Sequence, residues 1–337
     1  MDLKETVIAL SEIHGASGSE TAAAELALEM LCRYCPEAEI INGNVIGKFG
    51  THKEGLPNLV LDAHIDQIGM IVTHITDEGF IKIGNLGGID RRLLSAQQVV
   101  IHGTREIRGV ICSIPPHLSN GESKVLSFDD IAVDTGASKS ELEKIVSPGD
   151  SVTFDVKCRS LLGERITGGA LDDRSGVAAI LYALELLKDR ETAYNVTVVF
   201  SSQEELGERG AKIGAYSLAP DVVVAVDVSF AYADGEDRKK CGLLGKGAMI
   251  GIAPALSGEV SDGLICAAQS AGLPYQIEVM NGMTSTNADQ YSVSRCGAKV
   301  CTLSVPLRNM HTPVEVIDLL DVRNTAKILA EFIGRQS

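Results

Sequence analysis

The arrangement of apolar and polar positions changes twice along the chain. The first part predicts an amphipathic helix over residues 1–15 and a helix rich in alanine and leucine over residues 22–35. Two strands are expected to follow, over residues 39–50 and 58–65. Helices followed by strands with long apolar runs are typical of an α/β domain.

The middle of the chain has a different texture. Between residues 70 and 159 the segments are short, β-branched and separated by glycine or other turn residues. Helical periodicity is nearly absent there, apart from a short stretch over residues 138–146. This pattern predicts a small all-β barrel or sandwich.

Alternation of strands and helices resumes after Gly168. Helices are expected over residues 173–190, 209–219, 260–272 and 315–335, and strands over 195–202, 222–228, 248–253, 275–280 and 299–307. The second half therefore predicts a return to the α/β domain.

Charge and composition narrow the function classes. The net charge of −15 argues against nucleic acid and against anionic membrane surfaces as partners, because both repel an acidic protein. No apolar run approaches the roughly 20 residues needed to span a bilayer. The start lacks a secretory signal pattern and the eight cysteines are scattered, so we expect reduced thiols and a cytoplasmic location.

Acidic residues and histidines recur where the predicted strands of the α/β part end. Open α/β sheets build their sites at such strand ends. Histidines and carboxylates together are the ligands of a two-metal hydrolytic centre. The candidate residues are His64, Asp66, Asp172, Asp173, Glu204, Glu205, Asp227 and His311.

Each candidate also has an ordinary explanation when it is taken alone. Asp172 and Asp173 precede a predicted helix and fit an N-cap with a first-turn acid. Glu204 and Glu205 fit a solvated loop, and His311 fits a polar loop residue. Five such positions in one chain favour a metal site over five unrelated ordinary roles.

The chemistry expected of the pairs differs. His64 and Asp66 lie two positions apart at a predicted strand end, so their side chains should point the same way, and Asp66 should support the histidine. One carboxylate of the Asp172–Asp173 pair can bridge two cations. In the Glu204–Glu205 pair, one carboxylate can bind metal while its neighbour takes a proton from the attacking water.

The order and context of the motifs resemble a known family. The chain looks like the glutamyl and deblocking aminopeptidases that form tetrahedral particles, metallopeptidase family forty-two, over nearly its whole length. The segments that carry the resemblance are His64-Ile65-Asp66, residues 171–176, 203–211, 226–227 and 308–315, together with residues 86–90 and 109–118 of the β-rich part.

The resemblance implies an α/β fold: a mixed-sheet, three-layer aminopeptidase-like catalytic domain with an inserted small all-β domain. The boundaries expected are 1–67 and 164–337 for the catalytic domain and 68–163 for the inserted barrel, which makes the dimer contact. The oligomer implied is a homo-oligomeric dodecamer built from dimers. The substrates implied are peptides, from which N-terminal residues are removed.

The resemblance also implies residue roles. Asp172 bridges two divalent ions, zinc or cobalt, with manganese also suited to such ligands. His64 and Asp227 complete one site, Glu205 and His311 the other. Glu204 is the general base toward a water between the ions, Asp66 supports His64, and the Asp172–Asp173 peptide is cis.

Three positions depart from the family pattern without removing a ligand or the base. Gln67 stands where glutamate is usual, Asn287 where many members carry aspartate, and Arg91 where proline is common. These departures bear on the substrate subsites.

Two alternatives stay open at this point. A related metal-dependent amidohydrolase, a deacylase or a carboxypeptidase, would use the same metals. A non-catalytic assembly protein would be expected to have lost a ligand or the base, and none is lost here.

Overall fold

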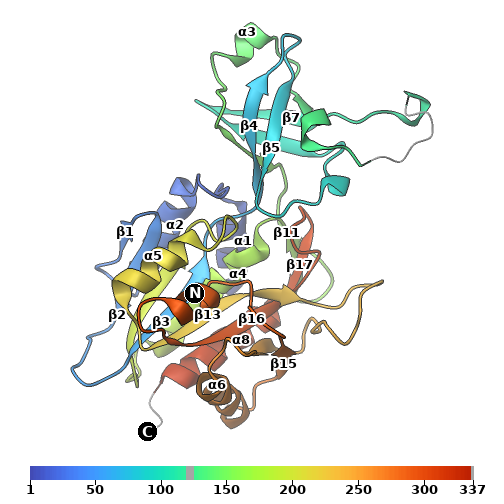
Figure 1. Ribbon diagram of the computed structural model, residues 1–337. Coiled ribbons are helices and arrows are strands. Elements are labelled where there is room, and N and C mark those ends of the chain that lie inside the picture. The colour runs from blue at the N-terminus through green and yellow to red at the C-terminus, as the bar shows by residue number, and fades with distance from the viewer. Residues whose placement is uncertain (119–124, 335–337) are drawn as a thin grey trace.

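The computed structural model describes residues 1–118 and 125–334 as a layered α/β domain that carries a separate β-barrel (Figure 1). The large mixed sheet holds 11 strands within these described residues. Its main path is β1 (Glu39–Ile41), β2 (Asn44–Phe49), β12 (Asn195–Ser201), β3 (Asn58–His64), β13 (Val222–Phe230), β16 (Lys299–Arg308), β17 (Glu315–Asp318), β11 (Arg165–Gly168) and β10 (Arg159–Ser160), while β14 (Ala248–Ile252) and β15 (Tyr275–Val279) extend from β16.

Helices cover both faces of this sheet. One face packs against α1 (Leu3–Glu12), α2 (Thr21–Leu31), α4 (Leu171–Leu187), α6 (Gly258–Ser270) and α8 (Leu319–Ile333). The other face packs against α5 (Arg209–Leu218) and α7 (Ala288–Val293). Because both faces are covered, the central strands are continuous apolar runs rather than alternating ones. The predicted three-layer, mixed-sheet domain is confirmed.

Four central strands run in the same direction. Strand β3 pairs in parallel with β12 and β13, and β13 pairs in parallel with β16. In this register His64 lies level with Ser201 at the ends of β3 and β12. The carboxyl ends of these strands therefore meet at one edge of the sheet, where open α/β sheets place their sites.

The inserted part is a closed antiparallel barrel. Its strands follow the order β4 (Gly69–Ile75), β5 (Ile81–Leu86), β8 (Ala132–Asp134), β7 (Glu106–Ile111), β6 (Gln98–His102) and β9 (Ser151–Phe154). The barrel has its own apolar core, and α3 (Lys139–Leu142) packs into it through Leu142. It stands apart from the layered domain in Figure 1. The insertion of a small all-β domain is confirmed, while the boundaries at 67 and 163 stay predictions.

The C-terminal helix expected over residues 315–335 is wrong at its start. Residues Glu315–Asp318 form β17, which pairs antiparallel with β11 and with β16. Helix α8 begins only at Leu319, and the Asp318 side chain accepts a hydrogen bond from the backbone N–H of Leu320 at 3.0 Å. Pairing with two neighbouring strands outweighs the helical pattern, which extends through Glu315–Asp318 by chance.

None of the helices in residues 1–118 and 125–334 is both long enough and apolar enough to cross a membrane.

Candidate metal centre

Six candidate residues converge on one cavity at the carboxyl edge of the parallel strands. His64 is the last residue of β3, Glu204 and Glu205 follow β12, and His311 follows β16. Asp172 lies at the start of α4. Asp227 was expected at a strand end but lies inside β13, which continues to Phe230. These six residues line a cavity of about 800 Å³ together with part of β14–β16.

Asp172 lies between the two histidines. Its Oδ1 is 3.0 Å from Nε2 of His64, and its Oδ2 is 3.4 Å from Nε2 of His311. Each histidine also places Nδ1 near a backbone carbonyl oxygen: that of Asp66 at 3.1 Å for His64, and that of Gly88 at 3.0 Å for His311. An Nδ1–H that donates to a carbonyl leaves Nε2 as the free nitrogen, which is the usual arrangement of a metal-binding histidine.

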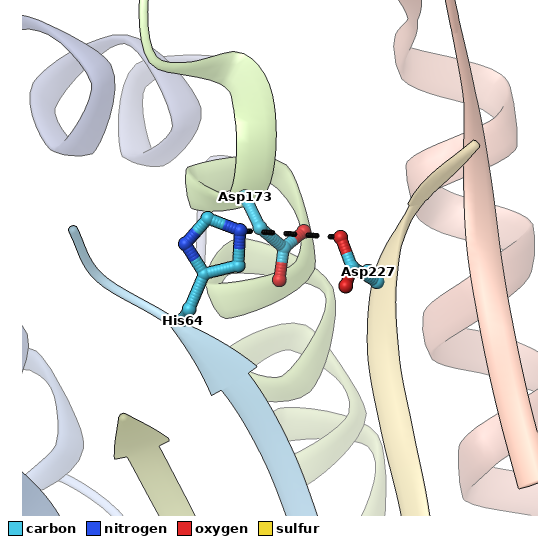
Figure 2. A group of neighbouring side chains, drawn as sticks. All are labelled: His64, Asp173 and Asp227. Carbon is cyan, nitrogen blue, oxygen red and sulfur yellow. Dashed lines mark ion pairs between the residues drawn. The ribbon is translucent and has the colours of Figure 1, made fainter. Parts of the chain in front are cut away.

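The remaining carboxylates divide between the two histidines. Oε1 of Glu205 lies 3.3 Å from Nε2 of His311, and Oδ1 of Asp227 lies 4.0 Å from Nε2 of His64. Figure 2 shows His64 at the end of its strand facing Asp227 on the neighbouring strand, with Asp173 between them. Glu204 is close enough to His64 and Glu205 to share a candidate ion with them.

Asp173 was a candidate in the sequence, but the family resemblance implied no role for its side chain. It is fully buried, and with His64 and Asp227 it forms a group of the size that holds a metal ion. Its Oδ1 accepts a hydrogen bond from the N–H of Gly176 at 3.0 Å, whereas Oδ2 has no hydrogen-bond partner in the part of the chain that the structure describes. The Asp172–Asp173 peptide bond is cis, as the family resemblance implies.

Asp66 contacts His64 and also holds the loop of Glu204 and Glu205, which the sequence did not indicate. Its Oδ1 lies 3.4 Å from Nδ1 of His64, although β3 has already ended at His64. The same carboxylate accepts hydrogen bonds from the backbone N–H groups of Glu204 and Glu205, at 2.9 and 3.1 Å. Asp66 therefore connects the end of β3 to the loop that carries the glutamate pair.

Glu315 is a second residue without an assigned role. Its Oε2 accepts hydrogen bonds from the N–H groups of Leu171 and Asp172, at 2.8 and 3.2 Å, and its Oε1 accepts one from His311 at 3.1 Å. This buried carboxylate holds the backbone on both sides of the Asp172–His311 contact. A glutamate in a strand that begins four residues after His311 could have pointed to this role, but the segment was assigned to a helix.

The pKa values of the buried groups indicate crowded carboxylates, whose charge a cation would offset. Burial, together with Asp227 and Glu205, raises the pKa of Glu204 to about 9. Burial and the neighbouring Asp172 raise the pKa of Asp227 to about 8. Burial alone would lower the pKa of His311, but Asp172 and Glu205 raise it to about 11.

Burial also acts against the pKa shifts of His64 and Asp172. It would lower the pKa of His64 and raise that of Asp172, yet their mutual contact moves both the other way. So many carboxylates in a buried place hold protons unless positive charge is supplied. The donor set of two imidazoles and several carboxylates fits divalent ions such as zinc, cobalt or manganese.

The three positions that depart from the family pattern lie outside the cavity lining. Gln67 forms an isolated β-bridge with Ala16, and Arg91 donates to the carbonyl of Leu126 at 3.3 Å. Asn287 donates to Oδ1 of Asp62 at 2.6 Å and to Oγ of Ser201 at 2.7 Å. Asn287 thus ties the segment before α7 to β3 and β12 rather than touching the cavity.

Comparisons with known proteins show which family the chain is similar to. A family model described as M42 glutamyl aminopeptidase matches residues 43–328. The chain is 32% identical over 325 residues to a lysyl aminopeptidase of Pyrococcus furiosus, covering 94% of this chain and 92% of the relative.

Two solved structures show the same fold over the full length. An aminopeptidase from the archaeon Desulfurococcus kamchatkensis superposes with a TM-score of 0.93 at 34% identity, covering 99% of this chain and 95% of the other. The TET1 peptidase of Pyrococcus horikoshii, described as assembling into a tetrahedron or a large octahedral shell, superposes with a TM-score of 0.86 at 30% identity, covering 99% of this chain and 100% of the other.

Proposed function

This chain belongs to the M42 glutamyl aminopeptidase family and is a metallo-aminopeptidase, and we propose that it removes N-terminal residues from peptides with two divalent metal ions and Glu204 as general base. The observation that carries the proposal is the position of Asp172. Its two oxygens face Nε2 of His64 and Nε2 of His311, at 3.0 and 3.4 Å. A carboxylate so placed can serve two cations at once.

The ligand assignment follows from the same contacts. His64 and Asp227 would hold one ion, Glu205 and His311 the other, and Asp172 both. Asp173 is buried beside His64 and Asp227 and would contribute a further carboxylate to the ion held there. Zinc or cobalt suits these ligands best, and manganese is also compatible with them.

Bound ions would supply Lewis acidity toward the scissile carbonyl and lower the pKa of the attacking water. Glu204 accepts the proton of that water and returns it to the leaving amine, which is a poor leaving group until it is protonated. Asp66 positions Glu204 by accepting its backbone N–H at 2.9 Å. Bound cations would lower the pKa of Glu204 from about 9, so that it is ionised when it acts as a base.

We propose further that the chain forms a homo-oligomer, a dodecamer built from dimers, through the barrel. Support comes from the exposed apolar residues around the end of β7: Val110, Ile114 and Leu118 are 46%, 58% and 74% exposed. Several exposed apolar side chains along one surface segment are candidates for an interface. The eight cysteines are all free, which supports a cytoplasmic location.

The test is the Glu204→Gln variant, with activity and metal content measured together. Turnover of aminoacyl anilides should fall by about 10²–10⁴, the usual contribution of a general base, while both ions are retained. Glu205→Gln should instead lower the metal content. Glu259→Gln is the matched control, because Glu259 is an exposed glutamate of α6 that pairs with Lys299.

Loss of an ion in Glu204→Gln with both ions kept in Glu205→Gln would reverse the assignment of the two glutamates. Hydrolysis of N-acyl amino acids in preference to aminoacyl anilides would favour a deacylase.

A further inference from the structure

One carboxylate in the cavity belongs to neither the metal ligands nor the base. Glu278 lies on β15 and lines the same cavity as His64, Asp172 and Asp227. Ser304 lies between Glu278 and Asp227. It pairs with Asp227 across β13 and β16, and its side chain forms a hydrogen bond with Glu278. The side chain therefore lies on the wall beside the metal ligands, where the side chain of a substrate residue would extend.

Glu278 is satisfied by hydroxyl groups only. It accepts hydrogen bonds from the hydroxyls of Ser229 and Ser304. Within residues 1–118 and 125–334 it forms no ion pair with a lysine, arginine or histidine. Burial raises the pKa of Glu278, which is the expected response of a carboxylate withdrawn from water without a cation beside it.

A second polar group, the hydroxyl of Thr302, lies on this wall. Its buried oxygen has no hydrogen-bond partner among residues 1–118 and 125–334. It is close to Gly251, where an added Cβ would lie 2.1 Å from Oγ1 of Thr302, and Gly251 pairs with Glu278 across β14 and β15. The glycine keeps open the space between the hydroxyl and the carboxylate.

The surrounding wall suits an unbranched aliphatic chain. Met249, Ile277, Val279 and Met280 line the cavity beside Glu278. A cavity lined by apolar side chains together with a carboxylate suits a lysine side chain, whose methylenes are apolar and whose ammonium donates three hydrogen bonds.

Two lysines at the rim would favour the opposite specificity. Lys239 and Lys240 also line the cavity, and both are exposed. Exposed charges are screened by water and salt, whereas a charge withdrawn from water acts more strongly on a neighbour. The half-buried Glu278 should therefore outweigh the two rim lysines.

We propose that Glu278 determines specificity by receiving the ammonium group of an N-terminal lysine. This inference rests on the proposed aminopeptidase function and adds its substrate class. The Glu278 carboxylate forms an ion pair only when such a residue binds against this wall. The free energy of that ion pair distinguishes lysine from an uncharged residue of equal length.

The test compares lysyl and norleucyl anilides, because norleucine has an unbranched aliphatic side chain like that of lysine but no ammonium group. In the metal-loaded wild type, kcat/KM for lysine should exceed that for norleucine by about 10–100-fold, since an unpaired polar group in the site penalises the uncharged analogue. Glu278→Gln should lower this ratio at least tenfold, and Glu278→Asp, which keeps the charge, should retain part of it. Glu259→Gln, an exposed glutamate on α6, should leave the ratio unchanged.

Calorimetric titration with L-lysine and L-norleucine supplies a readout that does not need turnover. Tighter binding of lysine that is lost in Glu278→Gln supports the proposal even if no anilide is cleaved, in which case the proposed function alone fails. An unchanged ratio in Glu278→Gln overturns the proposal. A wild-type preference for glutamyl anilides that disappears in a Lys239→Gln, Lys240→Gln double variant would also overturn it and assign specificity to the rim.

Discussion

The two histidines that face Asp172 are held in different ways. His64 ends β3, a central strand with neighbours on both sides, and its side chain is 2% exposed. His311 lies in the loop after β16 with a φ of 59°, and its side chain is 33% exposed. Its Nδ1 contacts the carbonyl of Gly88, which belongs to the segment between β5 and the remainder of the barrel.

The difference shows that the two halves of the centre depend on different parts of the fold. The His64 half is set by the parallel sheet, so it forms when the sheet forms. The His311 half needs Glu315 from β17 and Gly88 from the inserted segment, in addition to its own strand.

Replacing the histidines should separate the halves most clearly. His64→Ala should destabilise the metal-free protein by about 3–5 kcal/mol, because it removes the partner of a buried carboxylate. His311→Ala should cost less, since water reaches that side chain. Urea unfolding measures both effects, and metal content should show one ion lost in each variant. Equal destabilisation by the two variants would contradict the contrast.

The pH dependence of metal affinity should also differ between the halves. Asp227, with a pKa of about 8, and His311, with a pKa of about 11, both hold protons at pH 7 in the metal-free protein. Metal must displace these protons, so affinity should rise by about tenfold per pH unit for each proton released. At the His64 half both Asp227 and His64 release a proton, because contact with Asp172 also raises the pKa of His64, so below pH 8 the rise should be steeper there than at the His311 half.

Calorimetry in buffers of different ionisation enthalpy measures this proton release. The stability of the metal-free protein should change with pH in the direction opposite to that of the metal affinity. Both pKa values are raised on folding, so the stability they contribute to the metal-free protein is complete below the unfolded-state values and is lost as pH rises through 8 and then 11. Metal binding that takes up protons instead would show that the shifts are assigned wrongly.

Glu315→Gln should weaken metal binding and activity by about 10–100-fold, the usual effect of losing a partner that orients a ligand. The amide keeps one acceptor oxygen but cannot accept all three backbone N–H groups. Asp318→Asn in the same strand is the control, because Asp318 caps α8 and does not contact the centre. An equal loss of metal in Asp318→Asn would mean that β17 acts as a whole.

Gly88→Ala should affect only the His311 half. A Cβ at this position would lie 2.7 Å from Nδ1 of His311, so the ring must shift. Metal affinity at that half should fall roughly tenfold, at the lower end of such effects. Gly84→Ala in β5 is the control, since its nearest neighbours would be at 3.5 and 3.6 Å. A matching loss in Gly84→Ala would assign the effect to the barrel in general.

Much of the fold could be predicted because its signals are local. The apolar runs that became β3, β12 and β13 are long, and they can be fully buried only in a sheet with both faces covered. The short segments of the barrel are equally local in their pattern. Residues Glu315–Asp318 were misassigned because four residues carry too little periodicity to distinguish a strand from the first turn of a helix.

The residues that supply the chemistry can be named from the chain alone. Imidazoles and carboxylates lie at strand ends, in an order that resembles one family, and that resemblance already implied that Asp172 is shared. The arrangement of these groups comes from the tertiary structure: each oxygen of Asp172 faces one histidine, Asp173 and Glu315 are buried beside them, and Glu278 lines the same cavity. The physical reason is that burial and pairing depend on neighbours more than 100 positions away in the chain, which no local pattern encodes.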